Sequence, residues 1–226
     1  MRALVIEHDP GVPAGLVEEW LSERGAELEV WRVASDSSDP DVRGYDLIVT
    51  LGSEVAAYDD TVAWVPREQG LLRDAFDADV PILGICFGSQ SLARALGGRA
   101  LRAERPEIGW MTIEAREGSM VPIGPWLQWH HDTFTPPVGA SVLADSPAGP
   151  QAYTIGRSMG VQFHPEVTPE IVADWVAGAR DELDRERVDA DRMLADARAL
   201  DAENRARAVA LFDAFLDRVA RIGAPA

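Results

Sequence analysis

The chain has 226 residues, 46% of them hydrophobic and 26% charged, which is ordinary composition for a globular protein and excludes extensive disorder. Its formal charge of −17 at pH 7 disfavours nucleic acid and anionic membranes as partners, because affinity for polyanions comes from basic residues that neutralise phosphates. All 21 basic residues are arginine, which excludes Schiff-base chemistry on lysine and a phosphate-binding loop that needs lysine.

The cellular compartment is predicted from the cysteine count and from the first residues. A single cysteine excludes an internal disulfide, and residues 1–6 enter directly into a strand-like run without a basic start. No segment approaches the roughly 20 consecutive apolar residues that a spanning helix needs. We therefore expect a soluble, cytoplasmic protein.

Short apolar runs alternate with amphipathic stretches in the first half of the chain. Strands are predicted at 3–6, 28–33, 47–51 and 80–85, and helices at 14–24 and 66–76. The run at 80–85 is apolar throughout, which is typical of a strand buried on both faces. This alternation predicts an α/β fold with a parallel sheet.

The second half begins with short strands and ends with helices. Strand-like pieces at 109–115, 141–144, 152–155 and 159–163 are separated by Pro and Gly clusters, as in later sheet strands and hairpins. A helix start at Thr168-Pro169-Glu170 leads into two or three predicted helices. We divide the chain into a main α/β domain, 1–180, and a helical extension, 181–226. Helically spaced apolar residues of the extension should pack against the main domain or a second copy: Val209, Leu211, Phe212, Phe215, Leu216 and Val219.

The segment from Gly84 to Gln90 carries the strongest chemical signal. It places Cys86 between Gly84 and Gly88, after a buried strand and before a helical stretch, which is the pattern of a nucleophile elbow. A sharp turn presents the side chain, the glycines relieve crowding, and the helix amides and dipole favour a thiolate. A lone cysteine is more often a small buried hydrophobic residue, but the flanking glycines favour the nucleophile.

A base is available where a later strand-like run ends. His164 is followed two residues later by Glu166, and side chains two apart in an extended segment point the same way. Glu166 could therefore orient the imidazole and stabilise its charged form, as the acidic member of a triad does. Without the cysteine elbow, this His-Pro-Glu sequence would more often be a surface turn.

These two segments resemble known motifs. Gly84 to Gln90 is similar to the nucleophile motif of class I glutamine amidotransferases, and Gly160 to Glu166 to their His-x-Glu motif. Pro106 to Trp110 and Trp129 to Phe134 resemble segments of stand-alone members related to the glutaminase domain of GMP synthetase. The resemblance covers about residues 1 to 175, with four motifs in the expected order. It implies a three-layer, flavodoxin-like fold with a mostly parallel central sheet flanked by helices.

The resemblance also implies roles for individual residues. Cys86 would be the nucleophile, His164 the general base and then acid, and Glu166 its orienting partner. The oxyanion hole would combine the amide of Phe87 with the loop that contains Gly52 and Ser53. The implied substrate-binding residues are Gln90, which helps hold the amino acid end, and His130, His131 and Asp132, in a loop that borders the pocket.

Three positions depart from the family pattern. Ser53 stands where a glycine is frequent, Ser89 where a histidine is common, and His131 where the family usually has glycine. None removes a catalytic group, but each puts a side chain where the family's backbone comes close to its ligand. The identity of the substrate is therefore open.

Several functions fit this reading. The first is an amidotransferase-like hydrolase of γ-glutamyl amides that releases ammonia or an amine, with glutamine as substrate and a separate synthetase as acceptor. The second is a stand-alone γ-glutamyl peptidase or hydrolase, and the third is a non-catalytic binding protein on the same fold. A homodimer is possible, and no metal or cofactor is expected. His8 is predicted to be structural or solvent-facing.

Overall fold

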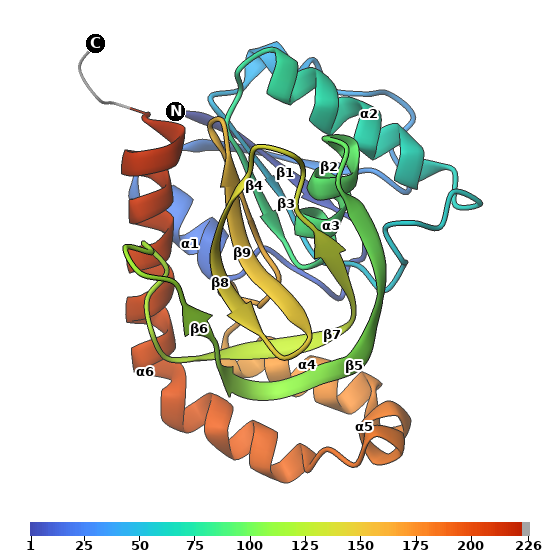
Figure 1. Cartoon of the computed structure of the whole chain (residues 1–226), viewed down its shortest axis with the longest axis vertical. Helices are drawn as coiled ribbons and strands as arrows, with labels where there is room; N and C mark the ends of the chain where they lie inside the picture. Colours follow the sequence, from blue (N-terminus) through green and yellow to red (C-terminus); the bar gives the residue numbers. More distant parts are fainter. Residues whose placement is uncertain (223–226) are drawn as a thin grey trace.

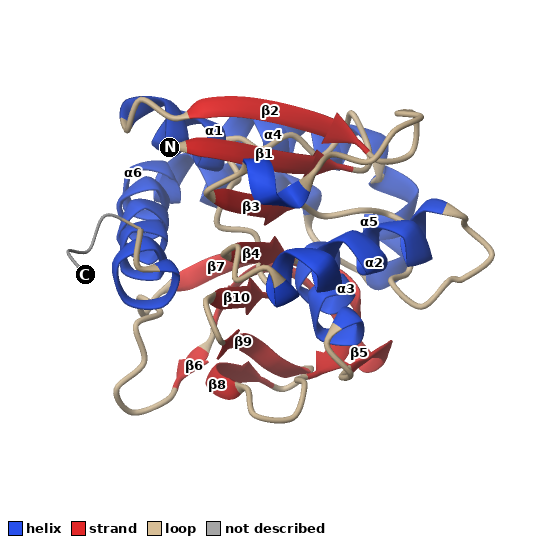
Figure 2. Cartoon of the chain, turned by 90° about the horizontal axis from the view of Figure 1, so that it is seen from above, coloured by secondary structure: helices blue, strands red, loops and turns tan. Residues whose placement is uncertain are grey.

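The computed structural model describes residues 1–222, and a mixed sheet forms its centre. Eight strands lie in the order β2-β1-β3-β4-β10-β9-β8-β6 in this part of the chain (Figures 1 and 2). The first five strands of that order are parallel and the last three are antiparallel. Their bounds are β1 Arg2–Glu7, β2 Glu27–Arg32, β3 Leu47–Thr50, β4 Ile82–Ile85, β6 Glu114–Ala115, β8 Ser141–Ser146, β9 Gly149–Ile155 and β10 Ser158–Val161.

Helices cover both faces of this sheet and form three layers (Figure 2). Their bounds are α1 Leu16–Glu23, α2 Trp64–Asp77, α3 Phe87–Ala95, α4 Pro169–Gly178, α5 Arg180–Glu186 and α6 Ala190–Ala214. Strand β1 is buried on both sides because its residues alternate between two cores: Ala3 and Val5 pack with α1 and α6, whereas Leu4 and Ile6 pack with α2 and α3. The predicted α/β class, the mostly parallel sheet and its flanking helices are confirmed.

A long two-stranded ribbon crosses below the sheet in Figure 1 and corrects one prediction. It pairs β5, Arg99–Thr112, with β7, Pro125–Thr135, and its register shifts between Arg102 and Glu107. We expected a strand only from 109 and a loop at 130–132, but these residues lie inside β7. The prediction failed because both strands are irregular in burial and gain their backbone hydrogen bonds from a partner far along the chain.

Three helices follow the sheet, in agreement with the two or three expected. The last, α6, continues as a π-helical segment, Phe215–Ala220, and packs lengthwise against the domain (Figure 1). Its residues Leu211, Phe212 and Phe215 belong to the same core as Trp20 of α1. The packing expected of the C-terminal apolar residues is therefore against the main domain, except at Val209, which is 37% exposed because it faces away from that core. Among the residues described, no helix is both long and apolar enough to cross a bilayer.

The buried aromatic side chain of Phe212 should be necessary for stability. Phe212→Ala is expected to lower the free energy of unfolding by about 3–5 kcal/mol, because the ring is fully buried and leaves a cavity. Urea unfolding followed by circular dichroism measures this change. Val209→Ala on the same helix is the control, with a loss below about 1 kcal/mol. Equal losses for the two variants would show that α6 does not contribute to the core.

Candidate active site

Cys86 lies in a strained turn between β4 and α3. Its φ is 50°, in the left-handed region that non-glycine residues rarely occupy, and its amide donates to the carbonyl of Val161 at 2.8 Å. A Cβ at Gly84 would lie 2.6 Å from the carbonyl oxygen of Gly88, and one at Gly88 would lie 2.2 Å from the carbonyl oxygen of Thr50. Only glycine fits at these two positions, so the elbow predicted from the sequence is present in the structure.

His164 and Glu166 form a buried pair beside this cysteine. Nδ1 of His164 lies 2.6 Å from Oε1 of Glu166, and both side chains are almost completely shielded from solvent. The amide of His164 donates to the carbonyl of Leu127 in β7 at 2.9 Å, which links this turn to the ribbon. On the other side, the ring of Trp175 packs edge-on against the imidazole, with ring centroids 4.9 Å apart. The imidazole is therefore fixed in position and has one nitrogen left to act.

The electrostatics of this pair favour a charged imidazole. Burial alone would lower the pKa of His164, but interactions with Glu166 and then Cys86 outweigh burial and raise it well above its ordinary value of 6.5. A protonated His164 is the partner that a thiolate at Cys86 requires, and it can later donate its proton to a leaving group.

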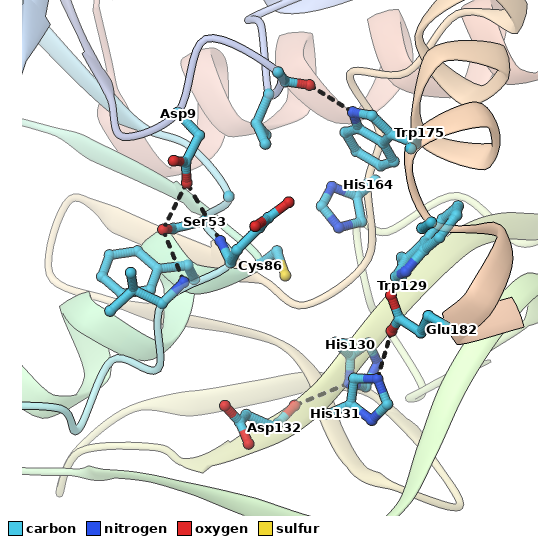
Figure 3. A pocket seen from close by; sticks show the side chains of 18 of the residues that line it. Asp9, Ser53, Cys86, Trp129, His130, His131, Asp132, His164, Trp175 and Glu182 are labelled. Atoms are coloured by element: carbon cyan, nitrogen blue, oxygen red, sulfur yellow. Dashed lines mark hydrogen bonds and ion pairs between the residues drawn. The ribbon is translucent and has the colours of Figure 1, made fainter. Parts of the chain in front are cut away.

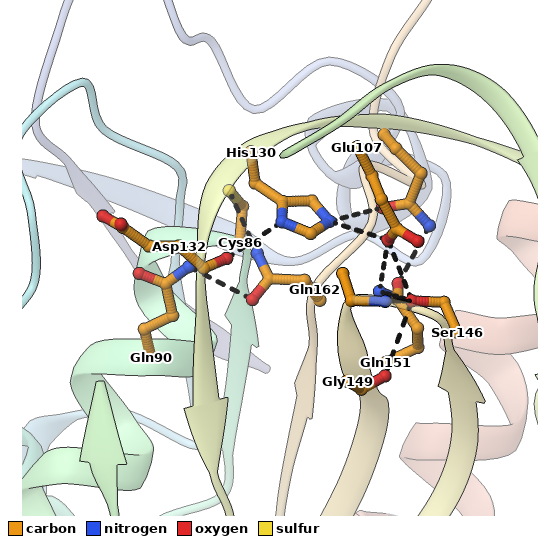
Figure 4. A network of polar contacts seen from close by, with 11 residues as sticks. Cys86, Gln90, Glu107, His130, Asp132, Ser146, Gly149, Gln151 and Gln162 are labelled. Carbon is orange, nitrogen blue, oxygen red and sulfur yellow. Dashed lines mark hydrogen bonds and ion pairs between the residues drawn. The ribbon is translucent and has the colours of Figure 1, made fainter. Parts of the chain in front are cut away.

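A hydrogen-bonded pair of glutamine side chains near the sulfur of Cys86 was not predicted from the sequence. Nε2 of Gln162 lies 3.5 Å from the Sγ of Cys86, and Nε2 of Gln90 donates to Oε1 of Gln162 at 3.1 Å (Figure 4). The spacing along the sequence could have predicted it, because Gln162 precedes His164 by two residues in an extended segment, as His164 precedes Glu166. Side chains at this spacing lie on the same face. Gln90, which was predicted to bind substrate, borders the cavity but also orients this amide.

The predicted oxyanion residues lie at the same place. Phe87 is the first residue of α3, so its amide has no partner within the helix. Gly52 follows β3, and a Cβ there would lie 3.3 Å from Cε1 of His164 and 3.9 Å from Cβ of Cys86. The loop backbone therefore passes close to the side chains of both Cys86 and His164.

The predicted site residues line one cavity of about 760 Å³ (Figure 3). The one exception is Glu166, which lies behind His164. Elements distant in sequence build it: the loops after β1 and β3, the start of α3, strand β7, and helices α4 and α5. Further lining residues, which the sequence did not single out, include Asp9, Glu54, Arg102, Trp129, Trp175, Asp181, Glu182 and Arg185. The tertiary structure brings the predicted set together, while the individual roles stay predictions.

The three departures from the family pattern differ in what they do to this cavity. The hydroxyl of Ser53 donates to Asp9 at 3.0 Å and accepts from the amide of Val55, so it organises its own loop. Ser89 is fully buried and donates to the carbonyl of Cys86 at 2.7 Å. His131 lines the cavity, and its Nε2 lies 2.7 Å from Oε1 of Glu182 in α5, so it joins strand β7 to that helix (Figure 3).

His130 borders the cavity, but its ring belongs to a polar network beneath it (Figure 4). Its Nε2 lies 3.1 Å from Oε1 of Gln128 and 3.2 Å from Oε2 of Glu107, while Nδ1 faces the carbonyl of Asp132 at 2.9 Å. Burial would raise the pKa of Glu107, but hydrogen bonds with His130 and Ser146 outweigh it and leave that pKa lowered. Both ring nitrogens of His130 are thus engaged by protein acceptors, which favours a structural contribution.

Comparison with known proteins places this geometry in a family. The family model described as glutamine amidotransferase class-I matches residues 15–173. A glutamine amidotransferase-like protein of Salmonella typhimurium is 30% identical over 81% of this chain and 83% of its own length. The GMP synthase [glutamine-hydrolyzing] of Thermus thermophilus is 42% identical over 41% of this chain, a match that spans only 20% of that enzyme.

Solved structures of other proteins superimpose on almost the whole of this chain. A glutamine amidotransferase from Thermotoga maritima superimposes with a TM-score of 0.88 at 26% identity and covers 96% of this chain and 98% of that one. A glutamine amido transferase from Methylobacillus flagellatus gives a TM-score of 0.89 at 25% identity, with 96% and 94% covered. The similarity therefore extends into the helices after residue 173.

The glycine after the elbow should not tolerate a side chain. Gly88→Ala is expected to lower the free energy of unfolding by more than about 4 kcal/mol, because the new Cβ meets the main chain of β3. Gly70→Ala is the control: its Cβ would meet no neighbour, and alanine should stabilise this exposed helix position by up to about 1 kcal/mol. Urea unfolding tests both variants, and a Gly88→Ala protein as stable as the wild type would contradict the described turn.

The His164–Glu166 pair should contribute to stability in a pH-dependent way. Because the folded-state pKa of His164 is raised, its contribution is fully present below 6.5 and is lost as the pH rises through the folded value. Glu166→Gln should therefore destabilise the protein more at about pH 6 than at about pH 9. Urea titrations at both pH values measure the difference, with Glu54→Gln at the cavity rim as the control. A destabilisation independent of pH would mean that the two groups are not coupled.

Proposed function

Since this chain belongs to the class I glutamine amidotransferase family, we propose that it hydrolyses a γ-glutamyl amide bond through a thioester on Cys86. The single observation that carries this proposal is the buried His164–Glu166 pair, at 2.6 Å, beside a cysteine held at φ 50° on the edge of a cavity. A structural cysteine needs neither the strained turn nor a buried acid–base pair next to it.

The first step is attack of the Cys86 thiolate on the γ-carbonyl carbon of the substrate. A carbon–sulfur bond forms, and the carbonyl π electrons move onto oxygen. In this proposal the amide of Phe87 and the loop at Gly52 and Ser53, which border the cavity, receive the oxyanion. The protonated His164 pairs with the thiolate before the attack and keeps its proton until the second step.

The second step releases the amine. The oxyanion collapses, the carbon–nitrogen bond breaks, and His164 gives its proton to the departing nitrogen. Ammonia or an amine leaves, and a γ-glutamyl thioester stays on Cys86. Glu166 compensates the imidazolium before this transfer and keeps the ring oriented after it, through the contact to Nδ1.

The third step hydrolyses the thioester. The neutral His164 takes a proton from water, and the resulting hydroxide attacks the thioester carbon. The carbon–sulfur bond breaks, the thiolate regains its imidazolium partner, and the product acid leaves. The covalent and proton-transfer steps use only the Cys86 thiolate, the His164 imidazole and water. After one turnover the thiolate and the imidazolium are both restored.

The size of the cavity favours a second candidate beside glutamine hydrolysis. At about 760 Å³ it falls within the roughly 300–1,000 Å³ typical of pockets for drug-sized ligands, whereas glutamine is much smaller. Two tryptophans, Trp129 and Trp175, and the charged residues Arg185 and Glu182 lie along it. A stand-alone hydrolase of larger γ-glutamyl amines or peptides would use this space.

The alternative with an acceptor enzyme also belongs to this proposal. One relative named above is a GMP synthase, and this chain matches only 20% of the length of that enzyme. A separate synthetase that receives ammonia would be the corresponding partner of this chain. In that case glutamine is the substrate, and the part of the cavity that glutamine does not fill is the path by which ammonia leaves.

One assay separates these possibilities and tests the nucleophile. Ammonia or amine release is measured from glutamine, γ-glutamyl dipeptides and γ-glutamyl p-nitroanilide, with Cys86→Ser beside the wild type. We expect Cys86→Ser to lose more than about 10³-fold in kcat while its melting temperature stays close to that of the wild type, because the change is nearly isosteric.

The substrate profile then decides the class. Efficient turnover of glutamine supports the amidotransferase assignment, and cleavage of the larger compounds alone supports the peptidase. Wild-type rates in Cys86→Ser would overturn the mechanism. A wild-type protein inactive on every compound would support a non-catalytic or partner-dependent role.

A further inference from the structure

His8 is buried behind the candidate active site and is not used by the mechanism above. It follows directly after β1, and its side chain is completely shielded from solvent. Nδ1 lies 3.0 Å from the carbonyl oxygen of Gly52, and Nε2 lies 3.0 Å from Oε2 of Glu68 in α2. The hydroxyl of Thr50 donates to the other carboxylate oxygen of Glu68 at 2.6 Å. Of the two outcomes predicted for His8, structural or solvent-facing, the structure shows the first.

The ring of His8 touches both parts of the predicted oxyanion hole. Beside the hydrogen bond to Gly52, it packs edge-on against the ring of Phe87, with centroids 4.7 Å apart. Trp64 covers another side at 5.1 Å. These contacts come from β1, β3, α2 and α3, so a single imidazole joins the elements that meet under the elbow.

The direction of the hydrogen bond to Gly52 is fixed by chemistry. A carbonyl oxygen only accepts, so Nδ1 of His8 must be the donor, and the carboxyl group of Glu68 is left to Nε2. The Gly52–Ser53 peptide is trans, so its N–H points away from its carbonyl. With the carbonyl held against His8, the amide of Ser53 is directed to the opposite side of the loop.

We propose that His8, held by Glu68, is a positioning residue that turns the Gly52–Ser53 peptide so that the amide of Ser53 faces the oxyanion. The proposal rests on the proposed function, because it assigns that amide to the thioester-forming step. His8 does not line the cavity and touches no reacting atom, so it acts only through this peptide.

The loop needs such a restraint because of its own sequence. Glycine is favoured at position 52, where a Cβ would crowd Val12 and His164 at 3.2 and 3.3 Å. The same residue has the greatest backbone freedom, so this peptide can rotate at little cost unless its carbonyl is held. An oxyanion donor is effective only when it is preorganised, and a freely turning peptide would lose most of that effect.

Glu68 completes this restraint by holding the ring of His8. Its side chain is fully buried, and the contacts to His8 and Thr50 compensate the cost of removing a carboxyl group from water. The carboxyl group fixes the imidazole through Nε2, which leaves Nδ1 directed at Gly52. This arrangement parallels that of His164 with Glu166, but it lies on the other side of the loop.

Two variants that differ in one donor test the proposal. His8→Leu removes the hydrogen bond to Gly52, whereas His8→Asn keeps a donor at nearly the position of Nδ1. With γ-glutamyl p-nitroanilide, His8→Leu should lose about 10²-fold in kcat, with KM changed less than about twofold, and His8→Asn should recover at least about tenfold of the loss. Alkylation of Cys86 by iodoacetamide forms no oxyanion and should proceed at the wild-type rate in both variants.

A second pair keeps the test valid if the unpaired Glu68 prevents folding. His8→Leu and His8→Asn are each combined with Glu68→Leu, which removes the buried charge together with its partner. The two double variants should show the same difference in kcat. Equal kcat values within either folded pair, or alkylation that falls in parallel with kcat, would overturn the proposal.

Crystal structures of the variants decide the proposal independently of activity. The Gly52–Ser53 peptide should be rotated in the variants that carry His8→Leu and unchanged in those that carry His8→Asn. An unrotated peptide in all of them would refute the role of His8, whatever the kinetics. A wild-type protein that cleaves no γ-glutamyl compound would instead count against the proposed function of the isolated chain, and the peptide orientation would still test the restraint.

Discussion

The turn at Cys86 is the constraint on which the candidate site depends. Chain direction reverses between a strand buried on both faces and a helix, and the cysteine adopts a left-handed conformation to allow it. The strain is tolerated because the main chain on each side is fixed by its neighbours: Cys86 donates to β10, and the amide of Gly88 donates to Leu51 at 2.9 Å. Cys86 is thus held in position by the centre of the sheet.

The groups that serve this cysteine reach it from the neighbouring parallel strands. Strands β1, β3, β4 and β10 end at the same edge, so His8, Gly52, Cys86 and His164 meet although they lie far apart along the chain. Ligands of open α/β sheets bind at this carboxyl edge. Two buried imidazole–carboxyl pairs stand on either side of the Gly52 loop, one beside the sulfur and one behind the loop.

The outer wall of the cavity has a different origin. The β5–β7 ribbon and helices α4 and α5 enclose the site from the side away from the sheet, and the His131–Glu182 contact joins ribbon to helix (Figure 3). Because these parts lie outside the central strands that hold Cys86, the wall can change without disturbing the elbow. Under the proposed function, the residues of this wall select the substrate, whereas Cys86, His164 and Glu166 perform the reaction.

The sequence alone determined the α/β class, the elbow around Cys86, the His164–Glu166 pair and the family, because each rests on local spacing: alternating apolar runs, glycines two residues either side of a cysteine, and a two-residue step in an extended chain. Only the tertiary structure decided that residues 130–132 lie in a strand, that Gln162 faces the sulfur, and that His8 meets Glu68, 60 positions away. These contacts join segments brought together by sheet order, and local spacing carries no information about which distant elements become neighbours.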